Sequence, residues 1–150
     1  MNRRLIGRRI LLVEDEVLIS CMLEDMLADL GCTLVGPAAR LSQAMSLVAC
    51  EVIDAVVLDL SLDRELSYPV ADELIARGIP FVLSTGYARD RLLLGYRSLP
   101  MLQKPFYPTE LERVLESFFP ELPPIEVVEA DRFGGSTRGQ FTAVASPSTH

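Results

Sequence analysis

The sequence contains no tryptophan and only one histidine, His150, which is its last residue. A lone terminal histidine excludes serine–histidine and cysteine–histidine nucleophilic machinery within a fold, and it excludes a histidine-ligated metal. The three cysteines, Cys21, Cys32 and Cys50, are odd in number and form no C-x-x-C pair. This pattern argues against disulfides and against a zinc site. We expect these cysteines to be small apolar residues in or near the core.

Long hydrophobic runs and an excess of positive charge are also lacking. No segment is long enough to cross a membrane, and the formal net charge of -7 argues against nonspecific nucleic-acid binding. Arginines crowd the N-terminus, but the apolar run that follows, at 10–13, is too short for a signal peptide. We therefore expect a cytoplasmic protein that binds neither DNA nor a membrane.

Short apolar runs alternate with amphipathic segments along most of the chain, and this alternation predicts the fold. The runs typical of strands are residues 10–13, 33–35, 55–59, 81–84 and 101–103. The segments typical of helices are residues 17–30, 41–48, 69–77, 90–96 and 108–119. The helix at 90–96 is the weakest, because its three leucines are consecutive. Five strand–helix units predict an α/β fold with a parallel sheet.

The composition divides the chain into three parts. Residues 1–7 are expected to form a flexible basic N-terminus, residues 8–120 the folded domain, and residues 121–150 a mostly disordered tail. Residues 60–69 are expected to be a loop. The tail has no periodic sequence of the length that a helix-turn-helix requires, so we expect no DNA-binding output domain.

Polar residues follow four of the predicted strands at the point where each strand ends. They are Glu14 and Asp15, then Asp59, then Ser84 and Thr85, and finally Lys104. The carboxyl ends of parallel strands meet at one edge of a sheet, where ligands bind. We therefore expect three acids, a hydroxyl and an ammonium to converge on one crevice.

Carboxylate oxygens at this edge suit Mg²⁺, which takes one or two protein carboxylates and keeps several waters. Asp15 and Asp59 are the predicted ligands, with Glu14 just behind them and a backbone oxygen near Ser61 as another. A carboxylate is also a nucleophile toward phosphorus and can form an aspartyl-phosphate. Asp59 is the best candidate because its strand is the most central.

Lys104 and Thr85 complete the predicted phosphoryl site. The Lys104 ammonium would neutralise developing charge, and the Thr85 hydroxyl would donate to a phosphoryl oxygen. Taken singly, each residue has an ordinary explanation: Asp15 as a helix cap, Lys104 as a surface lysine, and Thr85–Gly86 as a turn. Four polar strand ends in this order favour a shared site.

The residues Glu14–Asp15, Asp59, Thr85–Gly86 and Lys104–Pro105–Phe106 together resemble the CheY-like receiver domain of two-component response regulators. The resemblance covers roughly residues 8–120. It implies a doubly wound, five-stranded parallel sheet of order 2-1-3-4-5, with helices on both faces. It also implies that Asp59 accepts a phosphoryl group from a histidine kinase or a histidine phosphotransfer protein. Glu14 and Asp15 would then hold Mg²⁺, while Thr85 and Lys104 would contact the phosphoryl group.

The stretch 84–87 is similar to the FATGUY subgroup of mostly single-domain receivers, although Leu83 and Ser84 stand where that subgroup has Phe and Ala. Met101 occupies the place where many receivers carry a switching Tyr or Phe, and Tyr87 is the candidate to take over part of that role. Asp63 replaces a common Pro, which implies a different loop shape.

The sequence thus predicts a single-domain, non-enzymatic response regulator. Its output would be protein–protein contact, through the fourth helix and the fifth strand and helix, or action as a phosphate sink. One alternative is a haloacid-dehalogenase-type hydrolase, which usually has a second Asp two residues after the nucleophile; Ser61 occupies that place here. The other alternative is a binding module of the same fold that is never phosphorylated.

Overall fold

Five parallel strands form the central sheet of this computed structural model, which describes residues 2–121, 127–128 and 142–143. The strands are β1 (Arg9–Val13), β2 (Thr33–Ala38), β3 (Ala55–Asp59), β6 (Phe81–Thr85) and β7 (Met101–Gln103). Their order in the sheet is β2-β1-β3-β6-β7. Counted along the chain, this is the predicted order 2-1-3-4-5, so the doubly wound sheet is confirmed.

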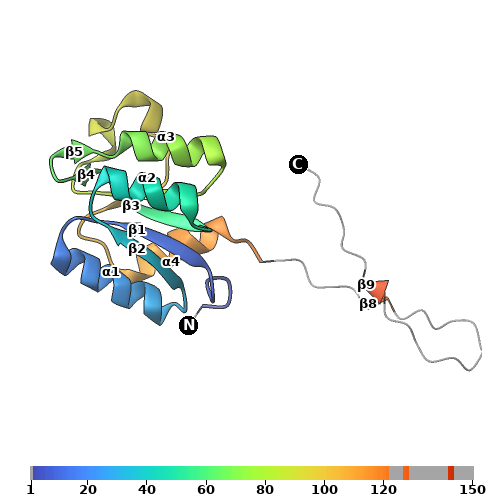
Figure 1. Cartoon of the computed structure of the whole chain (residues 1–150). Coiled ribbons are helices and arrows are strands. Elements are labelled where there is room, and N and C mark those ends of the chain that lie inside the picture. Colours follow the sequence, from blue (N-terminus) through green and yellow to red (C-terminus); the bar gives the residue numbers. More distant parts are fainter. Residues whose placement is uncertain (1, 122–126, 129–141, 144–150) are drawn as a thin grey trace, which may run out of the picture. The chain divides into compact units, whose positions relative to one another are not determined.

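Helices cover both faces of the sheet, and this explains the nearly continuous apolar strands (Figure 1). The helices are α1 (Val17–Asp29), α2 (Leu41–Cys50), α3 (Tyr68–Arg77) and α4 (Pro108–Phe118). On one face, Leu11, Val56 and Leu83 pack in a cluster with residues of α2 and α3. Their neighbours Leu12 and Val82 pack on the other face with residues of α1 and α4. Alternate residues of each strand therefore belong to opposite faces.

Glycine and proline mark several of the helix ends. Gly31 after α1 and Gly78 after α3 have φ values of 86° and 68°, in the left-handed region where glycine is favoured. Pro108 is the first residue of α4, and the Glu110 carboxylate accepts a hydrogen bond of 2.6 Å from the Tyr107 N–H. This bond ties the start of α4 to Pro108.

The helix predicted at 90–96 is wrong. Two short 3-10 turns, η1 (Arg89–Arg91) and η2 (Leu94–Tyr96), occupy this segment. Only the first of the three consecutive leucines, Leu92, is buried, so no helical face forms. Arginine side chains instead hold the loop: Arg89 donates to the Leu99 carbonyl at 2.8 Å, and Arg97 donates to the Leu92 carbonyl at 2.9 Å.

The segment predicted as a loop at 60–69 contains an antiparallel hairpin, formed by β4 (Ser61–Leu62) and β5 (Glu65–Leu66). Its two turn residues, Asp63 and Arg64, have φ values of 45° and 70°. Positive φ at both central residues is the geometry of a tight two-residue hairpin turn. Sequence reasoning did not detect this hairpin, because Asp-Arg is not one of the usual residue pairs of such turns.

The expected position of the cysteines in or near the core is wrong for two of the three. Cys21 and Cys50 are exposed on α1 and α2, whereas the half-buried Cys32 packs against the core cluster of α1 and α4. In the part of the chain that the structure describes, no helix is long and apolar enough to cross a membrane.

Residues 2–7 were expected to be a flexible N-terminus, but they pack against the domain. Leu5 is fully buried among residues of α1 and α4. The Asn2 N–H donates to the Leu30 carbonyl at 3.1 Å, and the Gly7 N–H donates to the Gly31 carbonyl at 2.9 Å. The Asn2 side chain also donates to Glu112 on α4 at 2.8 Å. Sequence reasoning missed the buried Leu5, because several of its neighbours are arginines.

The chain divides into two units, Met1–Pro120 and Glu121–His150. In the second, the short strands β8 (Val127–Val128) and β9 (Thr142–Ala143) pair in antiparallel fashion. Most of the segment expected to be a disordered tail, residues 121–150, lies outside the described residues.

Leu5 provides a test of the packed N-terminus. We predict that Leu5→Ala lowers the free energy of unfolding by about 2–5 kcal/mol, because it opens a cavity in the core. Its neighbour Ile6 is 53% exposed, so Ile6→Ala is the matched control and should change stability by less than about 1 kcal/mol. Urea unfolding of both variants checks this. Equal, small effects would mean that residues 2–7 do not stabilise the fold.

Candidate functional site

The predicted site residues all lie at the carboxyl edge of the sheet. Asp59 and Thr85 are the last residues of β3 and β6, while Glu14 and Lys104 directly follow β1 and β7. Backbone bonds keep the chain aligned here beyond the strands, because the Glu14 N–H donates to the Ala38 carbonyl at 2.9 Å and the Lys104 N–H to the Thr85 carbonyl at 2.7 Å. The parallel topology thus brings residues distant in sequence to one place.

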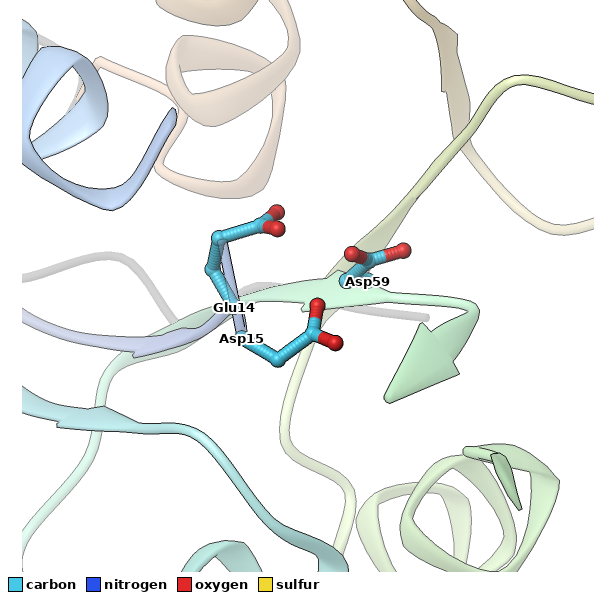
Figure 2. Close-up of side chains that lie close together, drawn as sticks. All are labelled: Glu14, Asp15 and Asp59. Atoms are coloured by element: carbon cyan, nitrogen blue, oxygen red, sulfur yellow. The ribbon is translucent and has the colours of Figure 1, made fainter. Parts of the chain in front are cut away.

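Three carboxylates gather between the ends of β1 and β3. One carboxylate oxygen from each of Glu14, Asp15 and Asp59 lies within 4.8 Å of the other two. Figure 2 shows the three carboxylates turned toward a shared space. Glu14 and Asp59 are buried, and Asp15 is partly exposed. A group of oxygen donors that is open on one side fits a hard divalent cation such as Mg²⁺, which retains part of its water shell.

The Lys104 ammonium lies against two of these carboxylates. Its Nζ is 3.1 Å from Glu14 Oε2 and 3.1 Å from Asp59 Oδ2. Removing one partner of such a buried pair would leave an uncompensated charge. Lys104 therefore neutralises part of the negative charge that two strand ends place together.

The pKa values of Glu14 and Lys104 reflect the crowding of charged groups at the site. Burial raises the pKa of Glu14 to about 7, and the charge of Asp59 and a hydrogen bond to it add to the rise, against the opposing effect of Lys104. Burial by itself would lower the pKa of Lys104, but the charges of Asp59 and Glu14 and the hydrogen bonds to them outweigh burial and raise it. Lys104 stays an ammonium at neutral pH, whereas Glu14 titrates there.

Backbone groups of the hairpin orient the other carboxylates. The Asp63 N–H donates to Asp15 Oδ2 at 2.9 Å, and the Ser61 N–H donates to Asp59 Oδ1 at 3.1 Å. The turn at Asp63 therefore positions Asp15. Asp63 and Arg64 are non-glycine residues with positive φ, so a strained stretch of backbone lies next to the site. The role of the Ser61 carbonyl as a metal ligand stays a prediction.

Thr85 lies at the same edge but makes different contacts from Lys104. Its side chain is buried, and its Oγ1 accepts a hydrogen bond of 3.0 Å from the Tyr87 N–H. Tyr87 itself is half exposed, and Met101 packs at the start of β7 against the cluster beneath α2 and α3. The switching role considered for Tyr87 stays a prediction.

Two serines near the site were given no functional role by sequence reasoning, although Ser84 was noted at the end of its strand. Ser67 is fully buried, and its Oγ donates to the Asp59 carbonyl at 2.6 Å. This bond anchors the phosphoacceptor candidate from behind. Ser84, the strand partner of Asp59, is also buried. Neither serine was assigned a role, because a serine in a loop or beside a threonine is ordinary.

An apolar groove of about 260 Å³ lies beside Lys104. It runs between α1 and the turn after β7, and its lining residues are Ile19, Met22, Leu23, Met26, Lys104, Pro105 and Phe106. The preceding helix residues Val17 and Leu18 are 75% and 81% exposed. Exposed apolar side chains next to a charged site are typical of a protein-contact surface.

No family model matches the sequence, but solved structures do. SdrG from Sphingomonas melonis Fr1 is 42% identical, with a TM-score of 0.67, and the match covers 77% of this chain and 97% of SdrG. The PhyR response regulator REC domain from Erythrobacter litoralis is 31% identical, with a TM-score of 0.67, over 75% of this chain and 90% of that one.

A third relative bears on the acidic cluster. The receiver domain of the sensor histidine kinase PA1611 from Pseudomonas aeruginosa PAO1 is 31% identical, with a TM-score of 0.60, over 75% of this chain and 97% of its own. That structure has a magnesium ion coordinated in its active-site cleft. The chain spans about half the length of the curated relatives it matches. The sheet order, the grouping of side chains at its carboxyl edge and these similarities agree, and the chain belongs to the response regulator receiver domains of two-component signalling.

Proposed function

We propose that this receiver domain accepts a phosphoryl group on Asp59, in a Mg²⁺-dependent reaction, from a histidine kinase or a histidine phosphotransfer protein. A carboxylate oxygen of Asp59 forms a bond to phosphorus as the bond between phosphorus and the donor histidine nitrogen breaks, and the electron pair of that bond stays on the nitrogen. The product is an aspartyl-phosphate that changes contacts with a protein partner, or that drains phosphoryl groups from the donor.

One observation carries this proposal: Asp59 lies next to two further acidic oxygen ligands and next to an ammonium. Glu14 and Asp15 provide the oxygens, and Lys104 lies 3.1 Å from Asp59. Attack by an anion on an anionic phosphoryl group requires positive charge close to the reacting atoms, which Lys104 and a metal ion would supply. The Thr85 hydroxyl, at the end of the neighbouring strand, keeps its proton available for a phosphoryl oxygen while its lone pair holds the Tyr87 N–H.

Magnesium fits the donor set of this chain. Glu14, Asp15 and Asp59 are the residues that would hold the ion, with the Ser61 carbonyl as a fourth protein ligand. The bound ion would supply charge neutralisation for the incoming phosphoryl group. The magnesium-bound relative supports this assignment.

Output is proposed to occur by protein contact at the segment that follows Thr85. Tyr87 is 50% exposed, and Leu93 and Leu94 are 58% and 80% exposed, in the turns that replace a regular helix. Large apolar side chains that are left in solvent next to a charged site favour a protein partner. The contact surface was expected on the helix predicted at 90–96 together with the fifth strand and fifth helix. Because η1 and η2 replace that predicted helix, the proposed surface consists of these turns with β7 and α4.

A hydrolase that uses the same aspartyl-phosphate intermediate is the competing function. The position two residues after Asp59 is Ser61, whose N–H is bonded to the Asp59 carboxylate. Ser61 has no carboxyl group to act as acid or base in the hydrolytic step. A turnover assay with a generic phosphate ester separates the functions, because repeated turnover would favour the enzyme.

Phosphorylation of Asp59 is tested by intact mass. With acetyl phosphate and Mg²⁺, we predict a mass gain of one phosphoryl group in the wild-type protein and none in Asp59→Asn. Chelation of the metal should abolish the gain, because Mg²⁺ neutralises the approaching phosphoryl group. Asp54→Asn, at a site away from the cluster, is the control and should behave as wild type. The absence of any gain, with a competent histidine kinase failing as well, would favour the unphosphorylated binding module.

The role of the Lys104 ammonium is tested by measuring the rate of phosphorylation. We predict that Lys104→Ala lowers the rate of phosphorylation by acetyl phosphate about 10²-fold, because a preorganised positive group at the reacting oxygens is lost. Arg113 is an exposed cation on α4, and Arg113→Ala should leave the rate within about twofold of wild type. Circular dichroism confirms that both variants are folded. A rate in Lys104→Ala equal to that of the control would remove Lys104 from the mechanism.

Glu14 predicts a specific pH dependence. The folded protein keeps the Glu14 proton up to about pH 7, whereas the unfolded chain loses it near 4.5. The folded state therefore binds more protons across this window, so this group makes stability fall as pH rises from about 4.5 to about 7. In chelating buffer, Glu14→Gln should lack this fall, and Mg²⁺ binding to wild type should tighten as pH rises through 7.

The control for this experiment is Asp25→Asn, since Asp25 is an exposed carboxylate on α1. Its urea-unfolding stability should follow the wild-type dependence on pH. If Glu14→Gln shows the same slope as wild type between pH values of about 5 and 7, the carboxyl of Glu14 is ionised throughout and the crowding argument fails.

A further inference from the structure

One buried hydroxyl has no hydrogen-bond partner. Within the described residues, Ser84 Oγ is the sole buried side-chain oxygen or nitrogen without a hydrogen-bond partner. Ser84 is only 1% exposed. Other serines near the site do have partners: the Ser67 hydroxyl donates to the Asp59 carbonyl at 2.6 Å. A buried polar group without a partner is unfavourable and calls for a physical explanation.

Ser84 faces the reacting groups. It pairs with Asp59 on one side and with Leu102 on the other, in the register of the sheet. Val82, two residues earlier, packs in the same cluster as Val57 and Leu102. Because side chains alternate between the faces of a strand, Ser84 lies on the same face as Asp59.

Lys104 crosses this face of β6. In the sheet, β6 lies between β3, which carries Asp59, and β7, which precedes Lys104. Neighbouring strands are about 4.8 Å apart, so β3 and β7 are separated by about 10 Å. Because Lys104 Nζ is nevertheless 3.1 Å from Asp59 Oδ2, its side chain spans the end of β6 where Ser84 is located.

The ammonium has three N–H donors, of which Glu14 and Asp59 accept two. Phosphorylation removes a negative oxygen from Asp59, and a bound metal competes for Glu14. Both acceptors of Lys104 therefore change in the modified state. The Thr85 and Ser67 hydroxyls are already engaged by Tyr87 and by the Asp59 carbonyl.

We infer that Ser84 is a positioning residue whose hydroxyl accepts a hydrogen bond from Lys104 when Asp59 carries a phosphoryl group. The inference rests on the proposed function. Ser84 Oγ gains its partner only in the modified state, so its unmet hydrogen bond penalises the unmodified state and favours the modified one. The hydroxyl also directs the ammonium toward the phosphoryl oxygen by holding it from beneath.

The test uses beryllium fluoride with Mg²⁺ as a mimic of the phosphoryl group. We expect Ser84→Ala to raise the melting temperature of the unmodified protein, because it deletes an unpaired buried hydroxyl. The same variant should bind beryllium fluoride about tenfold more weakly in calorimetry, because the hydrogen bond to the charged Lys104 is lost. A purely structural role for Ser84 cannot produce these opposite signs.

Two matched variants sharpen the result. Ser84→Cys keeps the branching of the side chain and fills its space with a slightly larger thiol that accepts hydrogen bonds weakly, so its loss of affinity should approach that of Ser84→Ala. Ser67→Ala removes a hydrogen bond that is already made, so it should lower the melting temperature of the unmodified protein.

The outcomes separate the inference from the proposed function. Wild-type protein that neither binds beryllium fluoride nor gains mass with acetyl phosphate would overturn both. Wild-type binding with equal affinity in Ser84→Ala would overturn the inference alone. A lower melting temperature for unmodified Ser84→Ala would do so too, because it would mean that the hydroxyl is already satisfied.

Discussion

The Lys104 ammonium, held between Asp59 and Glu14, is the interaction on which the rest of the site depends. The parallel sheet forces two buried carboxylates together, and two such charges are costly without a cation. Lys104 meets that need from the far side of β6, while burial, with the charge of Asp59 added, raises the pKa of Glu14 to about 7. Three carboxylates beside one ammonium form a group of oxygen donors that could hold a divalent metal ion.

The sheet supplies the rigidity that this arrangement requires. All residues of β3 are buried, and β1 and β6 pair with it on either side through apolar residues that alternate between two clusters. A shift of one residue in β3 would move Asp59 to the opposite face, and the same shift in β6 would move Ser84. Position at the site is therefore fixed by core packing, while the hairpin at Asp63 adds the finer orientation of Asp15.

Sequence reasoning recovered the parts that depend on local pattern. Apolar runs ending on Asp59 and Lys104 defined strands, and parallel topology then implied that their ends meet. It failed where distant contacts decide the structure. The segment at 90–96 is held by arginine side chains bonded to carbonyls, and Leu5 is buried by α1 and α4 despite its basic neighbours. Neither contact has a periodic signature in the sequence.

Thr85 connects the charged cluster to the surface. Its carbonyl holds the backbone of Lys104, and its hydroxyl holds the backbone of Tyr87. A phosphoryl group on Asp59 that draws on the Thr85 proton would reorient this hydroxyl and bear directly on the bond to Tyr87. The turns that follow are held by short backbone hydrogen bonds and by arginine side chains rather than by a helix ladder. A change at Tyr87 would therefore be passed along individual contacts, and not by the movement of a rigid helix, toward the exposed side chains of Leu93 and Leu94.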